Sequence, residues 1–428
     1  MSRYKNIPAG LFGRNRQKLC ERIGQSAVIV VFSASRQHRT GDQYYGYRQN
    51  SDFFYLTGIE EPGSVLVMCP QHPDETCRET LFTIIPDEKT KIWYGNTPTN
   101  SELSEISAIS SIKPVESLKS FIDDMLCFSN RFYISFEANI RTTPGYNLKS
   151  NEVLNDFQNQ YHYADFQNLD PVLKELRLVK EYEEISLIKQ ACRITRDAFS
   201  VLTKSVKPDK YEYEVESVIT QKFIASGASD HAYLPIVASG SNACVLHYNR
   251  NDSLMINGDL VLLDFGAEYA NYAADCSRTI PVNGRFSARQ ALLYNAVLSV
   301  FRQLKPEYKP GNTINILNEM AGILMQEEML RIGLLSQEDI KNQDAENKAY
   351  KKYFMHGVSH FLGLDVHDVG DKETKLLPGM VLTCEPGLYL PGEKLGIRIE
   401  NDILVDDYPI DLMADIPVEI NEIEDLMA

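Results

Sequence analysis

The stretch GDLVLLDFGAEYANYAADCSRTIPV, residues 258–282, joins two strand-like apolar runs, each of which carries one aspartate. Valine, isoleucine and tyrosine favour extended strands, and a short connection between two such runs predicts a tight hairpin. Alternation puts Asp264 on one face of the first run and its neighbours Leu263 and Phe265 on the other. Because a hairpin brings facing residues together, Asp264 and Asp275 are expected to point into one pocket.

Three further acidic or imidazole side chains follow, again inside short apolar phrases. His360 lies in HGVSHFLGLDVHD (356–368), Glu385 in TCEPGLYL (383–390) and Glu400 in GIRIENDILV (396–405). A buried carboxylate is costly unless it is paired or bound to a metal, and two divalent ions would neutralise four of them. Oxygen ligands with one imidazole suit Mn²⁺, Co²⁺ or Zn²⁺. The sequence therefore predicts a dinuclear metal hydrolase.

Length and charge limit the class of protein further. A chain of 428 residues is long for one core, so two domains are expected. The net charge of −16 argues against nucleic acid and anionic membranes as partners and favours a neutral or cationic substrate. The eight cysteines lack paired spacing, which predicts free thiols in a reducing compartment. With no secretory or membrane-spanning apolar segment, a cytoplasmic location is expected.

The domain boundary is expected where the sequence pattern changes. The first third alternates β-rich runs with helical spacing, which indicates an α/β domain; the runs are 27–32, 64–69, 80–85 and 131–136, and the helical stretches 116–126 and 151–161. Asp170-Pro171 then opens a helical passage with amphipathic spacing, which predicts a pair of helices packed on the second domain. The predicted domains are 1–170 and 171–428, and the second contains the five candidate ligands.

These phrases carry a family resemblance. The order Asp, Asp, His, Glu, Glu in LLDFGAEY, ADCSRT, HGVSHFLGLDVHD, EPGLY and GIRIEND resembles the pita-bread metallopeptidases, and the chain is most similar to aminopeptidase P. The N-terminal phrase YRQNSDFFYLTGIEEPGSVLVM (47–68) supports it. The resemblance implies an α/β N-terminal domain, 1–170, for substrate access and oligomerisation. It also implies an α+β pita-bread catalytic domain, 171–428, of the creatinase and aminopeptidase type.

The resemblance also implies roles for the metal ligands. Asp264 would bind one ion, Asp275 and Glu400 would bridge both, and His360 and Glu385 would complete the ligands of the other ion. The implied cofactor is a pair of divalent ions, Mn²⁺ first, with Zn²⁺ or Co²⁺ as alternatives. A hydroxide held between them would attack an Xaa-Pro bond and release the N-terminal residue, with Glu385 carrying the proton.

Further site residues follow from the same resemblance. His247, His356 and His367 look like imidazoles on the substrate side, and Arg398 faces the site. Asp42 and Arg177 resemble a charged link near the substrate entrance, and Tyr389 lines the pocket. Trp93, the only tryptophan, resembles an aromatic that a neighbouring subunit contributes, which implies a homodimer or homotetramer; a core position is the alternative.

Three rival functions stay open. Prolidase has the same metal site but cleaves only Xaa-Pro dipeptides. Methionine aminopeptidase lacks an N-terminal α/β domain of this kind. A non-enzymatic scaffold would use the same fold to bind peptide or protein without stoichiometric metal.

Overall fold

The computed structural model describes residues 4, 6–24, 26–135, 149–344 and 347–428. The chain divides into two compact units, 5–177 and 178–428, with Tyr4 grouped with the second. The division falls between Arg177 and Leu178, inside helix α7 (Asp170–Leu178). The sequence-based boundary at residue 170 stays a prediction.

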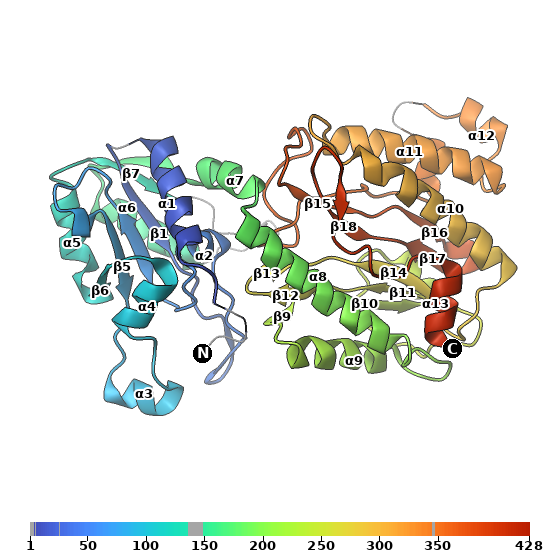
Figure 1. Ribbon diagram of the computed structural model, residues 1–428, viewed down its shortest axis with the longest axis horizontal. Helices are drawn as coiled ribbons and strands as arrows, with labels where there is room; N and C mark the ends of the chain where they lie inside the picture. Colours follow the sequence, from blue (N-terminus) through green and yellow to red (C-terminus); the bar gives the residue numbers. More distant parts are fainter. Residues whose placement is uncertain (1–3, 5, 25, 136–148, 345–346) are drawn as a thin grey trace. The chain divides into compact units, whose positions relative to one another are not determined.

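The N-terminal unit is built on one mixed sheet of the order β6-β5-β4-β1-β7-β8 (Figure 1). Its strands are β1 (Val28–Phe32), β4 (Val65–Met68), β5 (Glu79–Thr83), β6 (Ser111–Pro114), β7 (Arg131–Ile134) and β8 (Asp165–Asn168). The predicted runs at 27–32, 64–69, 80–85 and 131–136 correspond to β1, β4, β5 and β7, and Phe136 lies outside the described residues. A two-stranded hairpin, β2 (His38–Thr40) and β3 (Gln43–Tyr44), stands apart from this sheet.

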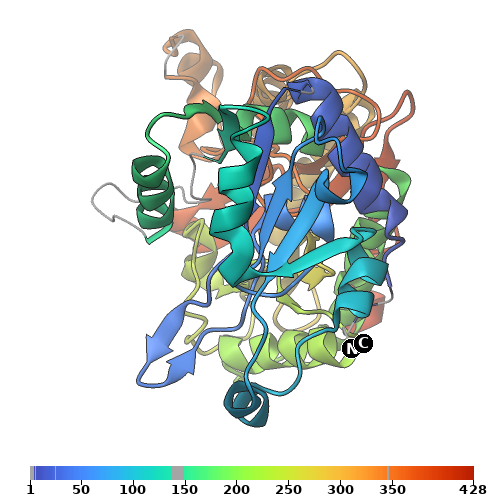
Figure 2. The same ribbon diagram turned by 90° about the vertical axis from the view of Figure 1, so that its left-hand side faces the viewer.

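Helices cover both faces of that sheet (Figure 2). Before α7, the α-helices of this unit are α1 (Gly10–Ile23), α2 (Ser51–Thr57), α3 (Glu88–Tyr94), α4 (Asn100–Ser107), α5 (Leu118–Met125) and α6 (Lys149–Gln160). On one face, Val28 and Val30 of β1 join a buried cluster with Phe121 of α5, with Phe157 of α6 and with Tyr161 directly after α6. Buried apolar side chains on both faces explain why the strands are near-continuous apolar runs.

The second unit places three antiparallel sheets of three strands each and a two-stranded hairpin among long helices (Figure 1). Its helices are α8 (Tyr182–Leu202), α9 (Glu212–Ala225), α10 (Ala288–Leu304), α11 (Ile314–Arg331), α12 (Gln337–Lys341) and α13 (Ile420–Met427). The first sheet has the order β10-β11-β14, formed by Ile236–Ser239, Leu260–Asp264 and Ser277–Pro281. The second has the order β15-β18-β19, formed by Val381–Cys384, Asn401–Leu404 and Ile410–Asp411, and β16 (Gly387–Leu390) pairs with β17 (Leu395–Arg398).

The predicted hairpin over 258–282 consists of four short strands instead of the two that the sequence indicates. Each arm breaks in two, so that β11 continues as β12 (Ala267–Tyr269), and β13 (Tyr272–Ala273) precedes β14; β12 also pairs with β9 (Asp230–His231). Ala270 and Asn271 close the tip with φ values of 52° and 63°, the left-handed pair that a tight hairpin turn needs. The break falls at Gly266, where a Cβ atom would lie 1.7 Å from the carbonyl oxygen of Ala274. Only glycine permits this approach of the two arms beside the aspartates.

Candidate metal centre

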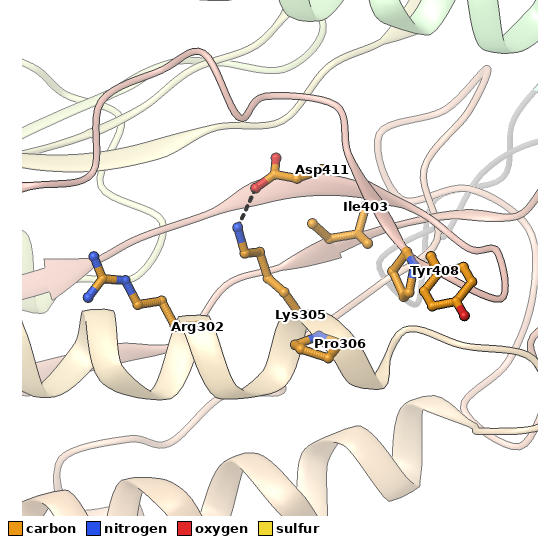
Figure 3. A pocket seen from close by; sticks show the side chains of 7 residues that line it. Arg302, Lys305, Pro306, Ile403, Tyr408 and Asp411 are labelled. Atoms are coloured by element: carbon orange, nitrogen blue, oxygen red, sulfur yellow. Dashed lines mark hydrogen bonds and ion pairs between the residues drawn. The ribbon is translucent and has the colours of Figure 1, made fainter.

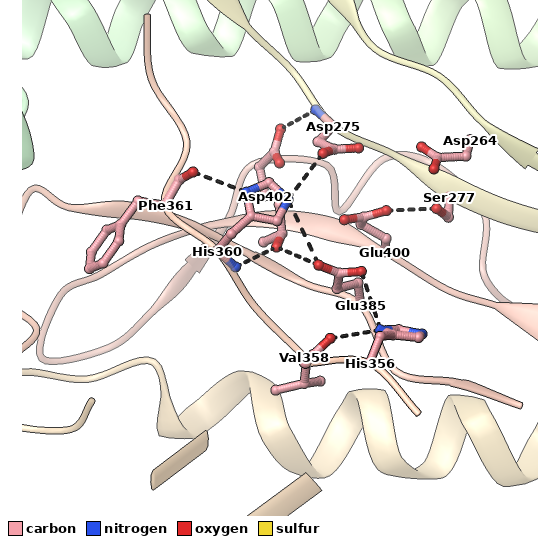
Figure 4. A network of polar contacts seen from close by, with 12 residues as sticks. Asp264, Asp275, Ser277, His356, Val358, His360, Phe361, Glu385, Glu400 and Asp402 are labelled. Atoms are coloured by element: carbon pink, nitrogen blue, oxygen red, sulfur yellow. Dashed lines mark hydrogen bonds and ion pairs between the residues drawn. The ribbon is translucent and has the colours of Figure 1, made fainter. Parts of the chain in front are cut away.

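Five side chains meet where the strands of the second unit end (Figure 4). They are Asp264 at the end of β11, Asp275 just before β14, His360 in the loop before β15, Glu385 directly after β15, and Glu400 directly before β18. Backbone hydrogen bonds join these ends, because Glu400 N donates to Ser277 O at 3.0 Å and Thr383 N donates to His360 O at 2.9 Å. Strand pairing therefore gathers ligands that are far apart in the sequence.

Three of these residues already have the spacing of a cation site. Asp275, His360 and Glu400 each offer a ligand atom within 4.8 Å of the others. His360 Nε2 lies 3.3 Å from Asp275 Oδ2 and 3.8 Å from Glu385 Oε1. His360 Nδ1 lies 3.0 Å from Phe361 O, and a carbonyl can only accept, so Nδ1 carries a proton and Nε2 faces the carboxylates.

Tyr233 completes the other side of the cluster, and it was missed by the sequence reasoning. Its hydroxyl lies 2.6 Å from both Asp264 Oδ1 and Asp275 Oδ1. No short motif surrounds it, and it lies 31 residues before Asp264 and 42 before Asp275 in the sequence. Asp402 was missed as well, although it follows Glu400 in the same phrase; its Oδ2 accepts from Asp275 N at 3.1 Å and from Cys192 Sγ at 3.4 Å.

Arg398 supplies a positive charge to the cluster. Its guanidinium pairs with Asp264 and donates to Ser277 Oγ at 2.7 Å and to the Tyr389 hydroxyl at 3.0 Å. Ser277 Oγ in turn donates to Glu400 Oε2 at 2.6 Å. Arg398 therefore holds Asp264 directly and Glu400 through Ser277.

The electrostatics of the cluster fit a cation. Burial raises the pKa of Glu385 to about 7, although the charges of His360 and Arg398 oppose the rise. Burial and then the charges of Asp275 and Glu385 raise the pKa of Glu400 well above its usual range. Burial alone would lower the pKa of His360, but the hydrogen bond to Asp275 and the charge of Glu385 raise it to about 9. Carboxylates that resist ionising side by side in a buried site are a ligand set for divalent metal, which would hold them charged.

His356 lies on the opposite side of Glu385 from His360. Its Nδ1 is 2.7 Å from Gly357 O and 3.7 Å from Glu385 Oε2, and its Nε2 is 2.8 Å from the Tyr389 hydroxyl. Burial, then the Arg398 charge, lowers the pKa of His356 to about 4, so the ring is neutral at pH 7. Its protonated Nδ1 donates to the carbonyl, and its Nε2 accepts from Tyr389.

The other two predicted histidines have exposed side chains. The His367 ring lies 4.3 Å from the His360 ring, in an edge-to-face contact. His247 lies in the loop after the short helix η3 (Gly240–Cys244), and its charge is among those that act on His356. Both residues are accessible to a substrate.

The predicted link between Asp42 and Arg177 is wrong. Arg177 Nη1 instead pairs with Asp52 Oδ1 at 2.7 Å, and Arg177 is 2% exposed. Asp52 lies in the first turn of α2, whereas Asp42 is exposed between β2 and β3 and accepts a hydrogen bond from Gln43. Only Asp52 can be buried with the guanidinium, because the turn that carries Asp42 is in solvent.

Trp93 is 73% exposed in the short helix α3. Its neighbours Ile92 and Tyr94 are 82% and 65% exposed. A core position for Trp93 is therefore excluded, and its predicted contact with a neighbouring subunit stays a prediction.

A separate cavity of about 290 Å³ lies beside β18 and the end of α10 (Figure 3). Its cations already have partners, because Lys305 Nζ lies 2.8 Å from Asp411 Oδ2 and Arg302 pairs with Glu419. None of the described residues that line it belongs to the predicted site. The candidate centre is the carboxylate cluster.

The fold and the cluster define a two-domain metal-dependent hydrolase. The model of the aminopeptidase P N-terminal domain matches residues 12–133, and that of metallopeptidase family M24 matches residues 186–407. The chain belongs to metallopeptidase family M24, and within it to the aminopeptidase P family. The predicted fold class, with a pita-bread catalytic domain, and the prediction of a metallo-aminopeptidase are both confirmed.

Individual relatives match along nearly their whole length. The Xaa-Pro aminopeptidase of Escherichia coli (strain K12) is 35% identical, with 97% of each chain covered. A solved structure of zinc-substituted E. coli aminopeptidase P in complex with product has a TM-score of 0.87 and 32% identity, with 99% of each chain covered. The human Xaa-Pro dipeptidase is 30% identical over 99% of this chain and 94% of its own.

No helix in the described parts of the chain is both long and apolar enough to cross a membrane.

Proposed function

We propose that this enzyme removes the N-terminal residue from peptides with proline in second position, using two divalent ions, Mn²⁺ first among them. The observation that carries the proposal is the convergence of Asp264, Asp275, His360, Glu385 and Glu400 in one buried cluster. The family and the match to an Xaa-Pro aminopeptidase support it.

The ligand roles are part of the proposal. Asp264 would hold one ion, Asp275 and Glu400 would bridge both, and His360 with Glu385 would hold the second. Bound ions of this kind activate a water near neutral pH and polarise the scissile carbonyl.

The remaining residues would position the substrate and move its proton. A neutral His356, fixed between Gly357 O and the Tyr389 hydroxyl, is ordered beside Glu385. We propose Glu385 as the proton carrier, because its carboxylate lies between two imidazoles, 3.7 Å from His356 Nδ1 and 3.8 Å from His360 Nε2, and a carboxylate placed beside the reacting bond can accept a proton and return it. The leaving nitrogen of an Xaa-Pro bond has no N–H and must gain a proton as the bond breaks, so it needs such a carrier. His247 and His367 would hold the peptide carbonyl and the intermediate.

Substrate length separates the proposal from a prolidase, which the match to human Xaa-Pro dipeptidase makes the second candidate. The Mn²⁺-loaded enzyme is offered Arg-Pro-Pro, Gly-Pro and Arg-Ala-Pro, and released amino acids are quantified. We expect rapid release of arginine from Arg-Pro-Pro alone. Strong preference for Gly-Pro would assign the chain to the dipeptidases, and equal cleavage of Arg-Ala-Pro would remove the proline requirement.

The metal count has its own test. Calorimetric titration of the metal-free protein with Mn²⁺ is expected to give two ions per chain. Electron paramagnetic resonance is expected to show the spectrum of a spin-coupled Mn²⁺ pair. Absence of stoichiometric binding of Mn²⁺, Zn²⁺ and Co²⁺ would refute the hydrolase and favour a binding scaffold. The cytoplasmic location and the homodimer or homotetramer stay predictions.

A further inference from the structure

Glu212 is a buried carboxylate that the proposed reaction does not use. It begins α9 and has no exposed surface (0%). Its Oε1 accepts from Ser239 N at 2.7 Å, Ser239 Oγ at 2.8 Å and Asn242 Nδ2 at 3.0 Å. Its Oε2 accepts from the Tyr248 hydroxyl at 2.7 Å and Ser253 N at 3.0 Å. Among the described residues no Lys, Arg or His contacts it, so neutral donors alone satisfy its charge.

All these donors belong to one segment, residues 239–253, here called the histidine loop. Ser239 lies at its start, Tyr248 near its middle and Ser253 at its end, and Glu212 N donates back to Ser253 O at 3.0 Å. His247 is the residue directly before Tyr248. The Glu212 side chain therefore hydrogen-bonds to both ends of the histidine loop and to Tyr248, the residue next to His247.

The histidine loop also packs on the hairpin that carries Tyr389 and Arg398. Tyr248 and Ala243 share a buried cluster with Tyr389. A Cβ atom at Gly396 of β17 would lie 2.2 Å from Ala243 O, so the two backbones are in direct contact. A shift of the loop would therefore displace groups on the substrate side of the metal centre.

We propose that Glu212 is a positioning residue, which sets the place of His247 through the histidine loop. A carboxylate is required because five hydrogen bonds converge on two oxygens that both accept. Glutamine has the same shape but only one acceptor oxygen, so its NH₂ group would face donors. The kinetic consequence rests on the proposed function, whereas the order of the loop does not.

The kinetic test compares Glu212→Gln with Glu214→Gln. Glu214 lies on the same helix, and among the described residues its side chain bonds only to Lys210 Nζ and Tyr211 N, so the same chemical change there leaves the histidine loop untouched. For E212Q we expect kcat on Arg-Pro-Pro to fall on the order of a hundredfold, with KM and bound Mn²⁺ near wild-type values, because a small misplacement of a substrate-side group has that effect. Wild-type kcat in E212Q, or an equal fall in E214Q, would overturn the proposal.

A double-mutant cycle tests whether Glu212 acts through His247. If Glu212 acts through His247, adding E212Q to His247→Ala changes kcat by less than about threefold, since the positioned group is already gone. If the two losses multiply, Glu212 does not act through His247.

Hydrogen exchange gives a readout that needs no activity. In E212Q the amides of Ser239 and Ser253, whose N–H groups bond to Glu212, are expected to exchange faster, while exchange in α9 is unchanged. Unchanged protection of both amides would refute the positioning role even if no Xaa-Pro peptide were cleaved. Should E212Q fail to fold, Tyr248→Phe removes a single donor, and it should reduce kcat by a smaller factor and loosen the same loop; normal kcat and exchange would overturn the proposal.

Discussion

The Tyr233 hydroxyl lies between two carboxylates, yet one hydroxyl proton can serve only one of them at a time. Its two short contacts fix the distance between the carboxylates of Asp264 and Asp275. Tyr233→Phe keeps the ring and removes this bond. We expect roughly a tenfold loss of Mn²⁺ affinity, as for other groups that orient metal ligands. Competition with a chelator measures it. Tyr213→Phe, an exposed ring on α9, is the control, and equal affinity in both variants would contradict the role.

His360 is the only imidazole among the predicted ligands. His360→Ala should abolish hydrolysis and weaken metal binding while thermal unfolding changes little, because the four carboxylates remain. Activity, metal content and the unfolding midpoint are measured together. His162→Ala changes an exposed histidine and should match the wild type in all three. Wild-type turnover in H360A would remove this residue from the ligand set.

The two arms that carry the aspartates depend on Gly266. Its substitution by alanine places a Cβ 1.7 Å from Ala274 O, so the backbone must move. We expect Gly266→Ala to lower the free energy of unfolding by about 1 to 3 kcal/mol, the usual effect of overpacking, and to weaken Mn²⁺ binding. Urea unfolding and calorimetry measure these effects. Gly392→Ala, where nothing lies within 4 Å of the new Cβ, is the control. Unchanged metal affinity in G266A would show that the arms are not coupled to the site.

Helix α8 begins with a buried carboxyl group that should make stability depend on pH. Glu184 accepts from Glu181 N at 2.8 Å and from the Tyr272 hydroxyl at 2.9 Å. Burial raises its pKa from 4.5 to about 6, against the opposing effects of the Glu181 hydrogen bond and the Lys180 charge. Because the folded-state pKa is raised, this group's contribution to stability is full below pH 4.5 and is lost as the pH rises through about 6.

Glu184→Gln removes the titration. Its NH₂ group replaces one of the two accepting oxygens, so one acceptor contact is lost, but that loss is the same at every pH and does not change the trend. The stability of E184Q relative to the wild type should therefore rise by about 2 kcal/mol between pH 4.5 and pH 7, since one pKa unit is about 1.4 kcal/mol. Urea unfolding at several pH values measures this difference. Glu319→Gln, at an exposed position of α11, should show no such trend. A difference that stays flat across the range would exclude Glu184 as its source.

Over the whole molecule, the net charge of −16 should attract peptides with a cationic N-terminal residue. Raising the ionic strength from about 0.05 to about 0.5 M shortens the screening length and should raise KM for Arg-Pro-Pro more than for Ala-Pro-Pro. Steady-state kinetics at both salt concentrations measure the ratio of the two KM values. A ratio that does not change with salt would show that local contacts, and not the net charge, attract the substrate.

The sequence by itself determined the class of fold, the family and the five candidate ligands, because strand alternation and local phrases place polar groups within otherwise apolar runs. Sequence analysis could not find Tyr233, which no motif marks. It also could not show that Arg177 pairs with Asp52 and not with Asp42. Nor could it show that Glu212 holds the loop of His247. These contacts join residues that are distant in the chain, and only tertiary packing decides which buried donors and acceptors meet. Local sequence patterns report the face on which a side chain lies, whereas its partner depends on how the strands and loops are assembled.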